Sequence, residues 1–420
     1  MRMKTKILAT LLVGLIVRIE LASFAGHPGD LALFAYSARL YYESGRFDYL
    51  FPTLPLVYYV QLAFYSLYVL MRDLGFSDLV FMFHTNFMVE GLFFRIPLIL
   101  SDLGIFALIL QFTGKLRYAA LYLLNPLIIY LTGAWGTYDS LMMLPLVYGF
   151  VLLAKNERRL ASVSFIIAGL FKLFGFVPFG LLAIENLLHR KWKEFGLQLG
   201  TAVGLTSLSF APYLGAGLQD FYVGFVLRFL GLSGASTRAY DVFAIFSGAR
   251  FAGSSPLIWL GVGVIAILFV LHVRKSKSTI QPLLLWSLVG AVALNAFSQS
   301  EPQWLSWVIP LSILYAYMTK RTGLAYYSYF YGIASAFLSI TILQSTGYLV
   351  LGTPLVFFNA IEAFKGSVAV YAITISSMLL VLLGYVFLKP VRFKVEIVAL
   401  VCLVYLQAYF WLSIMRILPV

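Results

Sequence analysis

Four carboxylates in this chain are candidates for a functional site: Asp30 as a general base, and Asp102, Asp139 and Glu301 as substrate-binding groups. Asp30 follows Pro28-Gly29, just beyond the first hydrophobic segment, at the level where lipid headgroups would meet water. A carboxylate at that depth costs little to solvate and can act as a general base toward a substrate held at a membrane surface. The structural alternative is that Asp30 is the N-cap of the helical pattern that begins at Leu31.

Aromatic side chains accompany two of these acids. Trp135 and Tyr138 precede Asp139, and Trp304 follows Glu301. The aromatic residues suit contact with a sugar or a headgroup, although Trp and Tyr also serve as interfacial anchors. Anchoring does not explain Asp139, which we therefore expect at a site, whereas Glu301 also fits an ordinary interfacial loop.

Several basic residues are candidates for binding a lipid phosphate, because a guanidinium group binds phosphate through two hydrogen bonds. They are Arg95, Arg228, Arg238 and Arg250, with His27 as a weaker candidate beside the Pro28-Gly29 turn. Arg95 and Asp102 lie at the outer end of a hydrophobic segment, where an ionised side chain needs a partner or a cavity. The alternative is that Arg95 snorkels and Asp102 pairs locally. We expect Lys172 to snorkel to the cytoplasmic face.

The composition is that of a polytopic membrane protein. Apolar residues make up 61% of the 420 residues and charged residues only 11%, and the mean hydropathy is +0.92. A soluble protein carries about a quarter charged residues. The net charge of +13 does not indicate nucleic-acid binding, because the basic residues lie at segment ends, as the positive-inside rule predicts. Cys402 is the only cysteine, which excludes an intrachain disulfide.

The hydrophobic pattern predicts a single integral membrane domain, residues 1–420, with about 13 transmembrane helices and a cytoplasmic N-terminus. The acidic residues then fall mostly outside. The first segment resembles a secretory signal, but Arg18 and Glu20 interrupt it, so we expect an uncleaved helix. The predicted spans are 7–23, 95–113, 117–133, 140–154, 160–172, 174–188, 197–213, 257–272, 280–297, 305–319, 324–342, 368–388 and 395–415.

Two long extracytoplasmic loops are predicted, 24–94 and 214–256. Within the first, helices 30–44 and 55–71 are expected to be amphipathic and to lie on the membrane face. If 55–71 and 76–94 span instead, two crossings are added and all later sidedness is unchanged. The chain has no phosphate-binding glycine-rich loop, no His/Cys metal spacing and no Gly-x-Ser-x-Gly elbow. No cofactor is therefore expected, and a divalent metal ion is compatible with the sequence but not implied by it.

In order and in predicted sidedness, these motifs resemble those of the GT-C glycosyltransferases, in particular membrane mannosyltransferases similar to GPI mannosyltransferase II. That family has an essential aspartate in the first outer loop, often as Gly-Asp, followed by a Tyr-Pro-Pro-Leu-like motif. It also has Lys-Leu-Pro before an Asp, and Asn-Pro before Trp-Gly-Gln-x-Asp. The matching positions here are Gly29-Asp30, Phe51-Pro52-Thr53-Leu54-Pro55-Leu56, Arg95-Ile96-Pro97 with Asp102, Asn125-Pro126, and Trp135-Gly136-Thr137-Tyr138-Asp139.

The chain departs from the family pattern at two places. Thr137 replaces the usual Gln, and Ser300-Glu301-Pro302 stands where the family has a His-Glu-Arg/Lys motif. The resemblance covers roughly the first 190 residues and the region 295–310.

The resemblance implies an all-α, GT-C-like helical core capped by the long first loop, with Asp30 as the catalytic base. It implies transfer of a hexose, mannose above all, from a polyprenyl- or dolichyl-phosphate donor to a glycan, glycolipid or protein acceptor. This would occur at the outer face of the cell membrane in a prokaryote or in the endoplasmic reticulum of a eukaryote. The alternatives are a lipid-linked glycan flippase or transporter, and a glycan polymerase.

Overall fold

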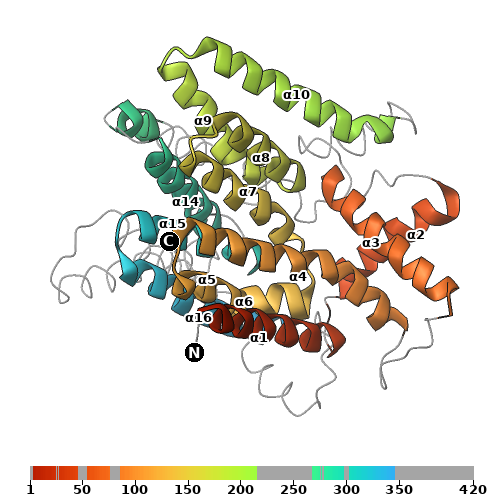
Figure 1. The fold of residues 1–420 in the computed structure, drawn as a ribbon. Helices are drawn as coiled ribbons and strands as arrows, with labels where there is room; N and C mark the ends of the chain where they lie inside the picture. Colours follow the sequence, from red (N-terminus) through yellow and green to blue (C-terminus); the bar gives the residue numbers. More distant parts are fainter. Residues whose placement is uncertain are drawn as a thin grey trace, which may run out of the picture. The chain divides into compact units, whose positions relative to one another are not determined.

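The computed structural model describes residues 3–24, 26, 28–45, 54–75, 86–214, 267–274, 276, 279–297 and 302–345 (Figure 1). All regular secondary structure in these ranges is helical, as the sequence predicts. The chain divides into two compact units. Unit 1 comprises Met1–Pro28, Ile109–Thr137 and Leu288–Val420, and unit 2 comprises Gly29–Leu108 and Tyr138–Ser287. The expectation of a single domain remains a prediction.

Unit 2 contains most of the helices that carry candidate site residues. In Figure 1, α7 and α8 lie side by side, and α9 and α10 pack on α8. Its elements are α2 (Pro28–Ser44), α3 (Pro55–Asp73), most of α4 (Asn86–Thr113), α7 (Asp139–Ala154), α8 (Arg158–Phe171), η3 (Leu173–Gly175), α9 (Phe176–Leu188), α10 (Trp192–Leu214) and the first half of α14 (Ile280–Phe297).

Glycines allow the helices of unit 2 to approach closely. A Cβ atom placed on Gly149 of α7 would lie 2.3 Å from the ring of Phe165 in α8. A Cβ atom on Gly104 of α4 would lie 2.7 Å from Leu144 of α7. A neighbouring side chain fills the space beside each glycine, so α7 packs closely against α8 at Gly149 and contacts α4 at Gly104.

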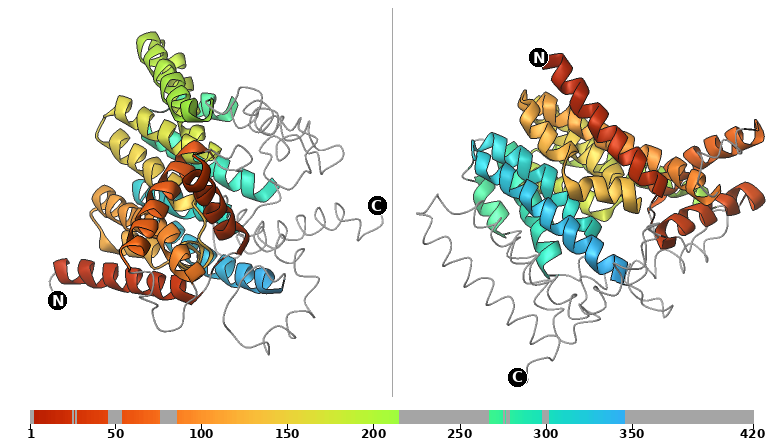
Figure 2. Two further views of the ribbon diagram at one scale, coloured as in Figure 1. Left: turned by 90° about the vertical axis from the view of Figure 1, so that its right-hand side faces the viewer. Right: turned by 90° about the horizontal axis from the view of Figure 1, so that it is seen from below.

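Unit 1 is built around a bent helix pair. Its elements are α1 (Met3–Phe24), the end of α4, α5 (Leu116–Leu123), α6 (Pro126–Ile129), the π-helix η2 (Tyr130–Trp135), the rest of α14, η5 (Pro302–Trp307), α15 (Val308–Met318) and α16 (Thr322–Ser345). Figure 2 shows α15 and α16 lying side by side. The chain bends by 46° between α5 and the segment Pro126–Trp135. The Asn125 side chain caps the second half by accepting from the amide of Leu127 at 3.0 Å. The bend therefore lies at Asn125-Pro126.

A buried arginine joins α1 to this bent pair. Arg18 is fully buried, donates from Nε to Thr132 Oγ1 at 3.1 Å, and donates from Nη1 to the Gly14 carbonyl at 2.9 Å. Gly133 of η2 makes room for the α1 backbone, since a Cβ there would lie 3.2 Å from the Arg18 Cα. Arg18, which interrupts the first hydrophobic segment, therefore makes a buried contact with η2.

The predicted segments agree with the structure in most of the described ranges, with boundary shifts of a few residues. The main difference lies in α4, which begins at Asn86, so residues 86–94 of the predicted loop are helical. The physical reason is a partner that the sequence did not identify. Glu90 is buried and forms an ion pair with Arg39 of α2, so the helix can continue through a charged residue. Spans 368–388 and 395–415, and most of 257–272, lie outside the described residues.

Within the described residues, one helix, Glu90–Thr113, is long and apolar enough to cross a membrane, and the bent pair is a second candidate. Shorter apolar helices include Asp139–Ala154 and Leu173–Leu188. Apolar side chains are also exposed in a row along α1, at Leu8, Leu12, Val13 and Ile16. Such a surface suits lipid better than water. The number of spans remains a prediction.

Candidate functional site

The backbone of Asp30 lies in the first turn of α2. Because α2 begins at Pro28, Asp30 is its third residue and not the N-cap that the sequence allowed. Proline suits the first position of a helix, where its missing N–H would have no acceptor in the helix. An acidic residue in the first turn is also favourable toward the helix dipole.

Aromatic packing places the start of α2 beside the start of α7. The rings of Phe34 and Tyr138 meet edge to face, with centroids 6.0 Å apart. Phe34 lies one helical turn after Asp30, and Tyr138 directly precedes Asp139. On the same face of α2, one turn before Phe34, Leu31 Cδ1 would lie 3.6 Å from a Cβ atom on Gly91 of α4. The two aspartates that the sequence singles out, Asp30 and Asp139, therefore belong to neighbouring helix starts in unit 2.

Asp139 forms an ion pair with Lys172. The Lys172 Nζ donates to Asp139 Oδ1 at 2.8 Å, and the exposed fractions of the two side chains are 14% and 3%. The same ammonium lies 5.0 Å from the centroid of the Tyr138 ring, within the range of a cation–π contact. The expectation that Lys172 snorkels to the cytoplasmic face is wrong, because its charge is met by a buried carboxylate. A buried lysine needs an anionic partner. The sequence did not indicate which acid this is, because Asp139 lies 33 residues before Lys172.

Arg95 and Asp102 are both fully buried in α4. They are separated by two helical turns, so they share one face. Leu98, on the same face, accepts a hydrogen bond from Ser140 Oγ at 3.2 Å through its carbonyl. This face of α4 is therefore directed toward the start of α7. The alternative of an Arg95 that snorkels is wrong, because the side chain has no exposed surface.

The aromatic candidates divide between the units. Trp135, at the end of η2, belongs to unit 1, where it is 5% exposed and meets Tyr130 edge to face at 6.1 Å. Trp304 also belongs to unit 1, where it is buried and stacks on Trp307 with centroids 5.7 Å apart. Both are packed inside unit 1, which does not fit the alternative of interfacial anchors. Tyr138 belongs to unit 2.

The remaining candidates lie outside the described residues: His27, Glu301, Arg228, Arg238 and Arg250. The Asp30 side chain is likewise not described. The roles expected for these residues remain predictions. Among the residues that the structure describes, no three His, Cys, Asp or Glu side chains are grouped as a metal ion would require.

A second ion pair, which the sequence did not predict, joins α2 to α4. Arg39 donates to both carboxylate oxygens of Glu90, at 3.1 and 2.5 Å. Tyr65 of α3 lies nearby and stacks on Phe94 of α4 with centroids 5.8 Å apart. Burial and the neighbouring charge of Glu90 raise the pKa of the Tyr65 phenol above its ordinary value, so the hydroxyl stays protonated at neutral pH.

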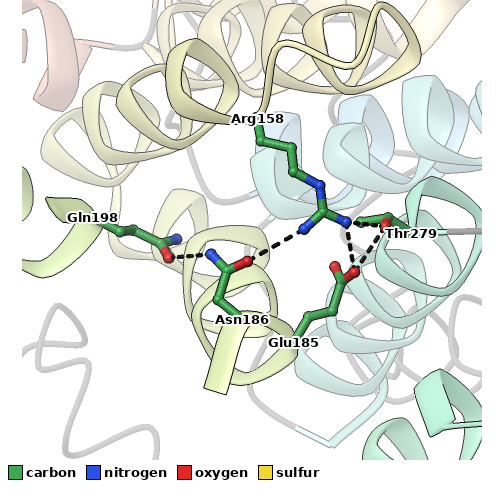
Figure 3. A network of polar contacts seen from close by, with 5 residues as sticks. All are labelled: Arg158, Glu185, Asn186, Gln198 and Thr279. Atoms are coloured by element: carbon green, nitrogen blue, oxygen red, sulfur yellow. Dashed lines mark hydrogen bonds and ion pairs between the residues drawn. The ribbon is translucent and has the colours of Figure 1, made fainter. Parts of the chain in front are cut away.

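A polar network, also missed, ties helix ends on the predicted cytoplasmic side (Figure 3). Arg158 Nη2 donates to Glu185 Oε1 at 2.7 Å, and Thr279 Oγ1 donates to the same oxygen at 2.7 Å. Arg158 Nη1 donates to Asn186 Oδ1 at 3.2 Å, and Asn186 donates to Gln198 Oε1 at 3.0 Å. The network joins α8, α9 and α10 to the residue that precedes α14, at the ends of α8 and α9 opposite to Lys172.

Comparison with known proteins gives one informative result. No family model matches this chain, and no curated protein matches it in sequence. A solved structure does match in fold. The fold is similar to that of ArnT. The matching structure is that of ArnT from Cupriavidus metallidurans, a crystal structure with undecaprenyl phosphate bound. Its TM-score against this chain is 0.52, and the two sequences are 15% identical.

The likeness to ArnT covers 98% of this chain and 77% of the ArnT chain. It extends over both units, although at this identity it concerns the fold alone. It shows that the two proteins share an overall helical fold.

Proposed function

We propose that this protein is a membrane glycosyltransferase that takes a sugar from a polyprenyl-phosphate donor. The likeness to ArnT over 98% of the chain is the observation that carries the proposal. ArnT was crystallised with undecaprenyl phosphate, and a lipid phosphate is the leaving group that such a donor would release. The contact between Phe34 and Tyr138, which brings the start of α2 close to the start of α7, adds support, because the motifs of the sequence predict Asp30 and Asp139 at one site.

In the proposed reaction, Asp30 accepts the proton of an acceptor hydroxyl. The hydroxyl oxygen forms a bond to the anomeric carbon while the bond from that carbon to the phosphate oxygen breaks, which inverts the configuration. The phosphate leaves as an anion, so no general acid is required, and a basic side chain neutralises its charge. Arg95, with Arg228, Arg238 and Arg250, is proposed for that role. The aromatic residues Trp135, Tyr138 and Trp304 would contact sugar or lipid.

The finer specificity is also a proposal. The motif resemblance favours a hexose, mannose in particular, as the transferred sugar, and a glycan, glycolipid or protein hydroxyl as the acceptor. The reaction would take place at the outer or lumenal membrane face.

Purified protein in vesicles, given radiolabelled polyprenyl-phosphate mannose and a panel of hydroxyl acceptors, tests the proposal. We expect label to move from the lipid to an acceptor. Label that crosses the bilayer while staying on the lipid would instead establish a transporter. Repeating the assay with other polyprenyl-phosphate sugars identifies the donor.

The role of Asp30 is tested by Asp30→Asn. The amide keeps the size of the carboxylate but cannot accept the proton, so transfer should fall about 10²- to 10⁴-fold. Binding of undecaprenyl phosphate and the yield of folded protein should be nearly unchanged. Glu43→Gln is the matched control, since Glu43 is an exposed acid at the other end of α2. Activity of Asp30→Asn within a few-fold of wild type would exclude Asp30 as the base.

A further inference from the structure

The break between α8 and α9 fixes the position of Lys172. Its backbone is extended, with φ −156° and ψ 136°, between the end of α8 and the turn η3. The chain then folds back so tightly that a Cβ atom on Gly175 would lie 2.2 Å from the carbonyl carbon of Ala168. The Phe176 ring fills the place beside Gly169, where a Cβ would lie 2.5 Å from ring carbons. Close packing thus leaves the Lys172 backbone little freedom.

The side chain of Lys172 in turn holds two consecutive residues at the start of α7. Its ammonium bonds Asp139 at 2.8 Å and lies 5.0 Å from the ring centroid of Tyr138. Phe34 of α2 packs on that same Tyr138 ring. Phe171, directly before Lys172, packs against the apolar cluster of unit 2 that contains Leu31 and Phe34. A chain of contacts therefore runs from Lys172 through Tyr138 and Phe34 to the first turn of α2.

We infer that Lys172 is a positioning residue, which sets Asp139 and, through Tyr138 and Phe34, the start of α2 that carries Asp30. This inference rests on the proposed function for its catalytic consequence. Lys172 acts through other residues, because its ammonium is mostly buried and is already engaged by a carboxylate and a ring. Removing one partner of a buried ion pair is strongly destabilising, so we expect Asp139 to shift when the Lys172 ammonium is removed.

Lys172→Met and Lys172→Arg separate positioning from substrate binding. Methionine fills similar volume without charge, and we expect kcat to fall about 100-fold, as displacement of a catalytic group by about 1 Å can produce. The donor KM and the affinity for undecaprenyl phosphate should change by less than about threefold, because no ligand of the donor is lost. Arginine keeps the charge and should restore most of kcat. Lys155→Met, which removes an exposed charge at the other end of α7, is the matched control.

A second measurement reports the position of α2 without using activity. In a Cys402→Ser background, Leu31→Cys and Gly91→Cys place thiols on α2 and α4, where the two residues are in contact. The rate at which a short bismaleimide cross-links them should fall severalfold when Lys172→Met is added. It should stay at the wild-type rate with Lys155→Met and return toward it with Lys172→Arg.

The outcomes are distinct. Weaker affinity for undecaprenyl phosphate with unchanged kcat would overturn the inference and make Lys172 a donor ligand. Unchanged cross-linking in folded Lys172→Met would overturn it directly. A drop in Tm that Lys172→Arg fails to rescue, with activity falling only in proportion to folded protein, would make the ion pair merely structural. A wild-type protein without transferase activity would refute the proposed function, and the cross-linking rates would still decide whether Lys172 positions α2.

Discussion

At the scale of single residues, the candidate site consists of charged side chains that are buried within the protein. Asp139 is 3% exposed with Lys172 at 2.8 Å, and Arg95 and Asp102 have no exposed surface. Ionised groups so far from water are costly and are retained in membrane proteins mainly where they have a function. This is the physical reason to assign these residues to the site.

Arg95 gives the prediction that belongs to this scale. If it contributes to binding the donor phosphate, Arg95→Ala should weaken the affinity for undecaprenyl phosphate by about 1.5–3 kcal/mol, or roughly 10- to 150-fold. Arg95→Lys should recover only part of this loss, because one of two parallel hydrogen bonds is missing. Lipid affinity can be measured by calorimetry on purified variants.

The control for Arg95 is Arg72→Ala, which removes an exposed arginine at the end of α3, whose partner Asp73 is also exposed. Its affinity for undecaprenyl phosphate should match that of wild type. An Arg95→Ala protein that loses stability and yet binds the lipid normally would show that Arg95 only holds α4 against its neighbours.

Single-residue roles were partly accessible from the sequence. Asp139 stood out because an aspartate is not explained by interfacial anchoring, and the structure gives it a buried place at a helix start. Its partner could not be found, because the contact between Lys172 and Asp139 depends on how α8 ends. Burial of Arg95 was one of two readings of an arginine at a helix entrance, and only packing decides between them.

At the scale of elements, the α8–η3–α9 break is the feature that places the Lys172 ammonium beside Asp139. The geometry of this break is tested by alanine substitutions at two glycines. Gly175→Ala should be strongly destabilising, by at least about 3 kcal/mol, because the new methyl group meets backbone atoms that cannot move aside. The loss is measured as a drop in Tm in detergent.

Gly180→Ala is a matched control in the adjoining helix. Nothing lies within 4 Å of a Cβ atom at Gly180, so alanine should be neutral or stabilising by up to about 1 kcal/mol. Equal Tm values for the two variants would mean that the tight turn at Gly175 does not exist in solution.

Helix positions were the most predictable feature of the chain. Apolar runs between basic clusters predicted α7 to α10 within a few residues, because each run has to be long enough for a helix and to end at a charge. The start of α4 was missed because Glu90 looks like a loop residue until Arg39 is placed beside it. The α8–α9 break was visible as Phe174-Gly175, but its geometry depends on Ala168 and Gly169 as well.

At the scale of the whole molecule, the predicted membrane topology decides which face of the membrane carries the candidate site. The prediction of a cytoplasmic N-terminus puts the start of α7 outside and its end, at Lys155, inside. In a Cys402→Ser background, a thiol at Glu43→Cys should react with a membrane-impermeant maleimide on intact cells. A thiol at Lys155→Cys should react only after permeabilisation. The reverse pattern would place the Asp30–Asp139 region on the cytoplasmic side and refute an outer-face site.

The contact between Arg18 and Thr132 has a consequence for biosynthesis. The two residues are 114 positions apart, so at 5–20 residues per second the ribosome makes the second about 6 to 23 s after the first. During that interval α1 contains an arginine whose tertiary acceptor does not yet exist. In a nascent chain arrested before residue 132, we therefore expect α1 to remain at the insertion machinery, less deeply inserted in the membrane than in the folded protein. In a chain arrested well after residue 132, we expect α1 to reach its final depth.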